Sequence, residues 1–122
     1  MPPSAPAEQR VIAPSGRLDA SAAPQFKESL TVVLEQDRPH IVVNLSDVPY
    51  LSSSILRVLL WAHKQARRAG GAMVLCCLTP QVLRVFKIVG FDQVLTICTN
   101  EEEARRALDA FNQPTNPGKE GE

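Results

Sequence analysis

The stretch from His40 to Arg68 constrains the fold of this 122-residue chain more than any other stretch. It opens with Ile41, Val42 and Val43, a β-branched run of strand length that is typical of a strand covered on both faces. A short polar step leads to three serines at 52–54 and then to a helical pattern. Serine is a favoured N-cap because its hydroxyl accepts a hydrogen bond from a free backbone N–H. The serine triplet is therefore predicted to lie where a loop becomes a helix, near the positive end of the helix dipole.

The rest of the chain repeats this alternation of strand and helix. Further strands are expected at 10–13, 72–78 and 94–98, and further helices at 21–35, 80–89 and 100–111. This order predicts an α/β fold with a mostly parallel sheet of four or five strands and about four helices. The predicted domain covers residues 9–111, between a flexible N-terminus at 1–8 and a disordered tail at 112–122.

Two of the helices have a readable face pattern. In the helix after the serines, the predicted core face consists of Leu56, Leu59, Leu60, His63 and Ala66. The predicted exposed side carries Ser54 together with Val58, Trp61, Gln65 and Arg68. Trp61 either packs on a neighbouring helix or belongs to a partner-binding surface, for which the expected residues are Arg57, Val58, Trp61 and Gln65. In the helix at 80–89, the apolar stripe consists of Val82, Val85, Phe86 and Val89.

Composition argues against several classes of function. The chain has 13 basic and 13 acidic residues, so no overall field attracts nucleic acid or an anionic membrane. No stretch approaches the roughly 20 apolar residues of a membrane-spanning helix, and residues 1–10 do not resemble a secretory signal. Cys76, Cys77 and Cys98 do not suggest a disulfide framework, and as buried reduced thiols they indicate a cytoplasmic location. No catalytic motif or metal-ligand spacing is recognisable, so we expect no enzyme, metal or cofactor.

A family resemblance rests on the same residues. The run IVVNLSDVPYLSSSILRVLL, residues 41–60, resembles the signature of the STAS domain, as found in bacterial anti-sigma factor antagonists. In that family a buried strand leads into Asp-Ser-Ser-Gly-Leu at the start of a helix, and the second serine is the phosphorylation site. The resemblance implies that Ser54 is the phosphoacceptor equivalent, with Ser53 as its neighbour. It also implies that Ser52 and Ile55 replace the family's Asp and Gly.

A second part of the resemblance lies before the first long helix. Gly16-Arg17-Leu18-Asp19 resembles the family's Gly-x-Leu-Asp step, which implies that Asp19 lies near the phosphorylation loop. Asp19 also suits a helix start, where a carboxylate is favoured, and both roles are compatible. The resemblance further implies a strand before residue 10, for which little chain remains.

The resemblance implies a stand-alone regulatory module that binds an anti-sigma factor, often a serine kinase, without binding nucleic acid or inserting into a membrane. An alternative is a STAS scaffold or an accessory subunit of a signalling complex or of a phospholipid-transport ATPase. A third is an enzyme or nucleotide-binding domain on the same fold. Ser52 carries no charge, and Ile55 is expected to place a branched side chain where the family glycine lets another protein approach. Both changes predict that Ser54 is phosphorylated slowly or not at all.

Overall fold

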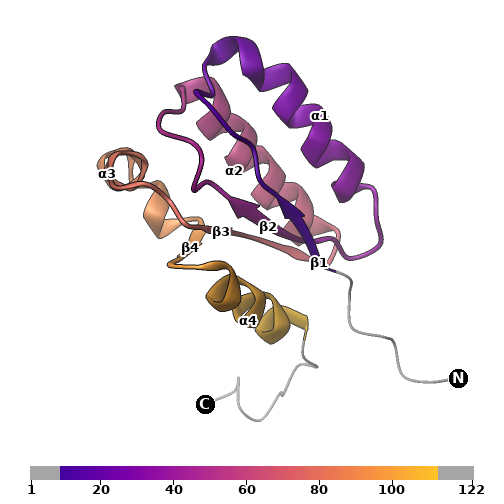
Figure 1. Ribbon diagram of the computed structural model, residues 1–122. Coiled ribbons are helices and arrows are strands. Elements are labelled where there is room, and N and C mark those ends of the chain that lie inside the picture. Colours follow the sequence, from indigo (N-terminus) through magenta and orange to yellow (C-terminus); the bar gives the residue numbers. More distant parts are fainter. Residues whose placement is uncertain (1–8, 113–122) are drawn as a thin grey trace, which may run out of the picture.

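Four strands and four α-helices alternate in the computed structural model, which describes residues 9–112 (Figure 1). The strands are β1 (Gln9–Ile12), β2 (His40–Asn44), β3 (Ala72–Cys76) and β4 (Thr96–Cys98). The helices are α1 (Ala23–Leu34), α2 (Ser53–Arg68), α3 (Pro80–Val89) and α4 (Glu101–Asn112), with short 3₁₀ helices η1 (Ala20–Ala22) and η2 (Phe91–Gln93). Residues 1–8 and 113–122 lie outside the described residues, and the domain boundaries stay predictions.

The strands form one sheet in the order β1-β2-β3-β4, and every neighbouring pair in this described part of the chain runs parallel. Residues 40–44 of β2 pair with residues 72–76 of β3 at the centre of the sheet. Figure 1 shows α1 and α2 on one face and α4 on the other. Parallel neighbours require such crossover connections, because the chain must return to the same end of the sheet before each new strand. The predicted α/β fold with a parallel sheet and four helices is confirmed.

Two apolar clusters lie on the two faces of the sheet. The larger one packs α1, α2 and α3 against side chains such as Ile41, Val43 and Leu75. The smaller one lies under α4 and consists of Val42, Ala72, Val74, Cys76, Ala104 and Leu108. Side chains of successive strand residues point to opposite faces, so the continuous apolar runs in β2 and β3 supply both clusters.

Individual residues mark the two ends of α3 and the start of β3. Thr79 is the N-cap of α3, and its Oγ1 accepts a hydrogen bond from the Val82 N–H over 3.3 Å. Gly90 ends α3 with a φ of 81°, a left-handed conformation that glycine adopts without steric cost. Gly71 precedes β3, and a Cβ added there would lie 1.8 Å from the Pro39 carbonyl oxygen. No side chain therefore fits at position 71 without a backbone shift.

β3 ends at Cys76, two residues before the predicted end at 78. The cause lies in Cys77, whose φ of 67° takes the backbone out of strand geometry. The Cys77 N–H still donates to the carbonyl oxygen of Cys98 over 3.3 Å, so the chain leaves the sheet directly after this bond. Cys76 is buried, Cys77 and Cys98 are half-buried, and all three are free thiols.

Candidate functional site

The serine loop, residues 45–52, connects β2 to α2 and is fastened to the segment that precedes η1. The Leu18 N–H donates to the Tyr50 carbonyl oxygen over 2.9 Å, and the Ser52 N–H donates to the Leu18 carbonyl oxygen over 2.8 Å. These two bonds form a short parallel bridge between Leu18 and Leu51, whose side chains are both buried. The two segments are thereby held side by side where β2 ends.

Ser52 is the N-cap of α2. Its Oγ accepts a hydrogen bond from the Ile55 N–H over 3.4 Å, and its carbonyl oxygen accepts one from the Leu56 N–H over 3.1 Å. Asp and Ser cap helices about equally well. Ser52 in place of the family aspartate therefore keeps a cap but brings no negative charge to the positive end of the helix dipole.

Ser53 and Ser54 lie in the first turn of α2, as the sequence predicts. Ser53 is exposed and Ser54 is half-buried. Neither hydroxyl has a hydrogen bond to another residue of the described part of the chain. Both hydroxyls are therefore available at a helix N-terminus, where an anionic group is favoured. The role of Ser54 as phosphoacceptor stays a prediction.

Asp19 is the N-cap of η1 and lies one residue beyond the bridge that holds the serine loop. Its Oδ1 accepts hydrogen bonds from the Ser21 hydroxyl over 2.6 Å and from the Ser21 N–H over 3.1 Å. The bond from the Ser21 hydroxyl is the main cause that lowers the pKa of the exposed Asp19 carboxyl, with help from backbone N–H groups and Arg17. The sequence thus places Asp19 correctly at a helix start, and the structure brings it to the same end of the sheet as the serine loop.

Two of the predicted site residues belong to the core instead. Ile55 is 0% exposed and Val58 is 9% exposed, and both pack in the larger apolar cluster. The prediction that Ile55 obstructs an approaching protein is therefore wrong, and so is the assignment of Val58 to a partner-binding surface. The cause is the position of α2, which is covered by α1 as well as by the sheet, so its buried arc is turned toward Ile55, Val58 and Ala62. Leu60 and His63, predicted to face the core, are only half-buried for the same reason.

Trp61 packs on the neighbouring helix and remains partly exposed. The Lys27 ammonium of α1 lies 4.7 Å from the centre of the indole ring. Trp61 and Gln65 also line a groove of about 350 Å³ between α1 and α2, with Thr31 and Leu34 on the other side. Arg57 is exposed. Trp61 is therefore at least partly structural, and a role of Arg57, Trp61 and Gln65 in partner binding stays a prediction.

Comparison with known proteins decides the family. Residues 3–104 match the model of the STAS domain. The chain belongs to the STAS domain family. This assignment agrees with the resemblance of the serine loop and with the parallel four-stranded sheet.

Relatives of this STAS domain are named as anti-sigma factor antagonists. BtrV of Bordetella bronchiseptica, which carries such a name, is 34% identical over 93 residues, or 76% of this chain and 80% of BtrV. The anti-sigma-B factor antagonist of Listeria monocytogenes is 32% identical over 89 residues, or 73% of this chain and 78% of that protein. A Thermotoga maritima crystal structure, described as an anti-sigma factor antagonist, has a TM-score of 0.75 at 25% identity and covers 81% of this chain and 86% of its own.

The STAS domain exposes an apolar face on α3 that the sequence did not reveal. Val82 and Phe86 are buried as expected, but Val85 and Val89, assigned to the same stripe, are 37% and 48% exposed. Ile88 is 76% exposed. The signal available in the sequence was an excess: α3 has more apolar residues than one core-facing stripe uses.

The α3 face continues into the serine loop. A small hollow of about 60 Å³ is lined by loop residues Pro49, Tyr50 and Leu51 and by α3 residues Gln81, Val82 and Val85. Tyr50 is exposed, and the Arg17 guanidinium lies 4.3 Å from the centre of its ring. Tyr50 and the outer face of α3 therefore adjoin at this hollow, and the first-turn serines follow the same loop along the chain. We call these residues together the serine-loop surface.

Two further observations concern other kinds of site. Among residues 9–112, no group of three or more His, Cys, Asp or Glu side chains is arranged to hold a metal ion. Within the same residues, no helix has the length and apolar character needed to cross a bilayer.

Proposed function

We propose that this STAS domain is an anti-sigma factor antagonist that binds an anti-sigma factor through the serine-loop surface. The names of the relatives support the class of function. The observation that carries the location is the exposed apolar face of α3, Val85, Ile88 and Val89, which adjoins the serine loop at Tyr50 through Val85. An exposed apolar patch rimmed by polar residues is typical of a protein-binding site. The role is binding rather than catalysis, in the cytoplasm and without a cofactor.

The composition of the serine-loop surface suits a protein partner. Tyr50 and Arg17, stacked on one another, offer the aromatic and arginine side chains that dominate the binding energy of many interfaces. Arg57 extends the same surface along α2. Ile88 supplies a large apolar side chain that is almost fully exposed in the free protein. Burial of these groups on binding would provide the apolar centre of the interface.

Phosphorylation of Ser54 would act on this interface through charge. A phosphoserine adds about two negative charges, which the N-terminus of α2 tolerates but a closely fitting partner does not. The kinase that is often the partner in this family would carry out the transfer. We propose that Ser54 is phosphorylated slowly, because Ser52 does not provide the family carboxylate. The argument from Ile55 no longer contributes, since its side chain is buried.

The binding experiment uses the purified full chain and each anti-sigma factor encoded in the same genome, titrated by calorimetry. Ile88→Glu is expected to weaken binding about tenfold or more, because it places a charge at the apolar centre of the interface. Val32→Glu is the matched control, since Val32 is also an exposed aliphatic residue, on α1. Equal effects of the two substitutions, or no binding to any anti-sigma factor, would contradict the proposal.

The phosphorylation experiment incubates the chain with magnesium, ATP and the anti-sigma kinase, and follows intact mass over time. A single phosphate is expected to appear slowly, to be absent in Ser54→Ala, and to appear faster in Ser52→Asp. Rapid stoichiometric transfer to the unmodified chain would show that Ser52 does not impair the site.

The alternative is an accessory STAS subunit of a signalling complex or of a phospholipid-transport ATPase, not switched by phosphorylation. The neutral Ser52 cap favours it, because a subunit of this kind needs no phosphoacceptor geometry. Failure of every anti-sigma factor to bind, together with no phosphate on Ser54, would favour this alternative.

A further inference from the structure

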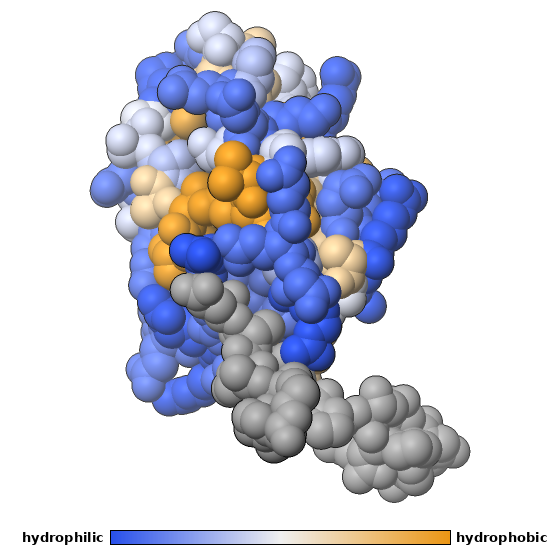
Figure 2. All heavy atoms as spheres, turned by 90° about the vertical axis from the view of Figure 1, so that its right-hand side faces the viewer, coloured by the Kyte–Doolittle hydropathy of each residue, from blue (hydrophilic) through white to orange (hydrophobic). Residues whose placement is uncertain are grey.

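The three cysteines lie together at the carboxyl ends of the last two strands. Cys76 ends β3 and Cys98 ends β4, and the two residues are partners in the parallel pairing. Cys77 follows Cys76 directly, and all three side chains pack in the smaller apolar cluster under α4. Figure 2 looks at the opposite end, where the amino ends of the strands lie, and shows hydrophobic side chains gathered at its centre. The thiols are therefore apart from that patch and at the same end of the sheet as the serine loop.

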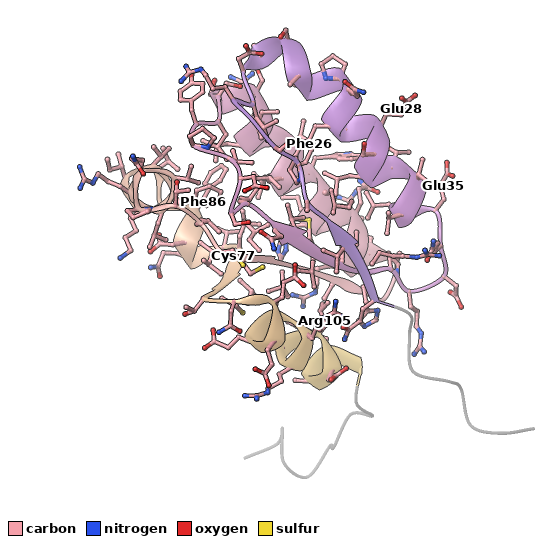
Figure 3. The ribbon with its side chains drawn as sticks, viewed as in Figure 1. Phe26, Glu28, Glu35, Cys77, Phe86 and Arg105 are labelled. Atoms are coloured by element: carbon pink, nitrogen blue, oxygen red, sulfur yellow. The ribbon has the colours of Figure 1, made fainter. Side chains whose placement is uncertain are left out.

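The backbone at the end of β3 brings two of these thiols into contact. In a regular strand the side chains of successive residues point to opposite faces of the sheet. The φ of 67° at Cys77 breaks this alternation, and the Cys77 thiol donates a hydrogen bond to the Cys76 Sγ over 3.0 Å. Figure 3 labels Cys77 where β3 ends. A left-handed backbone is uncommon for a residue with a side chain, and such residues cluster at functional sites.

The two thiols in contact differ in their exposure to solvent. Cys77 is half-buried, and the next residue, Leu78, lines a groove of about 400 Å³ together with Cys98 and Thr99. A small solute can therefore reach the Cys77 sulfur. Cys76 is fully buried, and burial raises the pKa of its thiol, which stays protonated at neutral pH. Because the thiolate is the reactive form of cysteine, an oxidant is expected to react at Cys77 first.

We propose that Cys76 and Cys77 form a redox pair, which a hydroperoxide oxidises to a disulfide between adjacent residues. The Cys77 thiolate attacks the terminal oxygen of the hydroperoxide, the O–O bond breaks, and Cys77 becomes a sulfenic acid. The leaving alkoxide takes up the proton that Cys77 has lost. The Cys76 sulfur then bonds to the Cys77 sulfur, the S–O bond breaks, and the departing hydroxide takes the Cys76 proton to form water.

The geometry of the pair suits this reaction. A disulfide bond is about 2 Å long, so the two sulfurs have to approach by only about 1 Å from their present separation. Disulfides in a reducing compartment are usually transient and redox-sensing, so a cellular thiol is expected to reduce this one again. The site does not depend on the proposed function, because its oxidation state can be measured without any partner protein.

The test oxidises the reduced full chain with hydrogen peroxide, alkylates the remaining thiols in urea and digests the product with trypsin. Cleavage after Arg68 and Arg84 releases both cysteines of the pair in one peptide, residues 69–84. Cys98 lies in another peptide, residues 88–105. The first peptide is expected to lose two hydrogen atoms and to escape alkylation, and dithiothreitol is expected to restore both thiols. The second peptide is expected to remain alkylated and separate from the first.

Three variants assign the roles of the sulfurs. Cys98→Ser is the matched control and is expected to change the rate of disulfide formation less than about twofold, since Cys98 takes no part in the exchange. Cys76→Ala removes the second sulfur, so a sulfenic acid on Cys77 is expected to persist and to be trapped by dimedone. Cys77→Ser is expected to abolish the disulfide, and circular dichroism checks that each variant is folded. Because Cys77 is half-buried, its variant tests the pair even if Cys76→Ala does not fold.

A second measurement separates the effect of the fold from that of adjacency in the sequence. The chain is equilibrated with mixtures of reduced and oxidised glutathione, once folded and once in urea. The equilibrium constant for the disulfide is expected to be at least about tenfold larger in the folded chain, because the fold holds the two sulfurs together.

Four results would overturn the proposal. A crosslink between the two peptides would show that Cys98 is the disulfide partner. Sulfinic acid on Cys77 without a disulfide would show that the Cys76 sulfur does not reach it. Three thiols that all remain alkylated after peroxide treatment would show that the pair is inert. Equal equilibrium constants in the folded chain and in urea would show that the fold does not favour the disulfide.

Discussion

The two faces of the sheet are built differently, although the same strands supply both. The face under α1 and α2 carries large side chains, including Ile41, Met73 and Leu75. The face under α4 is lined by smaller ones, such as Ala72, Val74 and Cys76. Polar contacts supplement the α4 side: the Asn44 amide donates to Glu101 over 2.6 Å, and the Gln9 amide donates to Asp109 over 3.0 Å. Figure 3 shows the side chains of both layers, with Phe26 in the first layer and Arg105 on α4.

The difference indicates which layer positions the candidate site. Leu18, Leu51 and Ile55, which fix the serine loop and the start of α2, all belong to the larger cluster. α4 packs on β2, β3 and β4, away from the serines. The first layer therefore sets the geometry of the serine-loop surface, and the second layer mainly covers the sheet.

The strongest test of this comparison disrupts both layers at once. Gly71→Ala would place a Cβ 1.8 Å from the Pro39 carbonyl oxygen, directly before the central strand β3. We expect a loss of about 3 kcal/mol or more in the free energy of unfolding, because the clash is with backbone and not with a flexible side chain. Urea denaturation followed by circular dichroism measures it.

Gly16→Ala is the matched control for Gly71→Ala. Nothing lies within 4 Å of a Cβ at position 16, but its φ of +86° is unfavourable for alanine. We expect a cost of about 1 kcal/mol from this conformation alone. A milder effect at Gly71 than at Gly16 would mean that the backbone around Pro39 yields easily.

A second test truncates one buried side chain to alanine in each layer. Ile55→Ala in the larger cluster is expected to cost about 3 to 4 kcal/mol in the free energy of unfolding, and Leu108→Ala under α4 about 2 to 3 kcal/mol. Both side chains are fully buried, but the thinner α4 layer can relax more easily into the space left behind. If Leu108→Ala is the more destabilising variant, the proposed ranking of the layers is wrong.

The sequence predicts the strands and helices well because the relevant signals are local. Thr79-Pro80, Gly90 and the β-branched run at 41–43 each have a physical effect within a few residues. Burial on α2 was predicted less well, because a helical wheel gives a period but not the number of layers that cover the helix. Ile55 and Val58 face the core because α1 packs over α2. This tertiary contact cannot be read from the sequence of α2 alone. The start and cap of α2 were predicted, while the exposed face of α3 was missed, although the excess of apolar residues on that helix was a signal for it.

A third test removes the polar link of the α4 layer. Asn44→Ala deletes the hydrogen bond to Glu101 and also the acceptor of the Ser46 N–H, which lies 2.9 Å from the Asn44 Oδ1. We expect a loss of about 1 to 2 kcal/mol, since one of these bonds has a charged acceptor. Glu101→Gln keeps an acceptor but removes its charge, and is expected to cost less. Equal losses for the two variants would indicate that the charge, and not the Asn44 contacts, stabilises this layer.

The smallest expected effect concerns His63, on the part of α2 that neither layer covers fully. The His63 side chain is half-buried, and its Nδ1 is buried with no hydrogen-bond partner in the described part of the chain. Burial is the main cause that lowers the pKa of His63 in the folded protein, and the positive charges of Arg67 and Lys64 lower it further. The folded state thus prefers the neutral ring, whereas the unfolded chain binds a proton near the ordinary pKa of about 6.5.

The stabilising contribution of neutral His63 is therefore fully present above about pH 6.5 and is lost as the pH falls through the lowered pKa of the folded state. Urea denaturation at pH 7.5 and at about pH 5.5, above the range where carboxylates titrate, measures this loss. Relative to His63→Gln, which cannot titrate, the unmodified chain is expected to lose stability at the lower pH. This pH-dependent loss in the free energy of unfolding should be smaller than the losses expected for the substitutions above, because the ring is only partly removed from solvent. If the two proteins differ in stability by the same amount at both pH values, burial does not lower the pKa of His63. If the unmodified chain gains stability relative to His63→Gln at the lower pH, a hydrogen-bond acceptor stabilises the protonated ring.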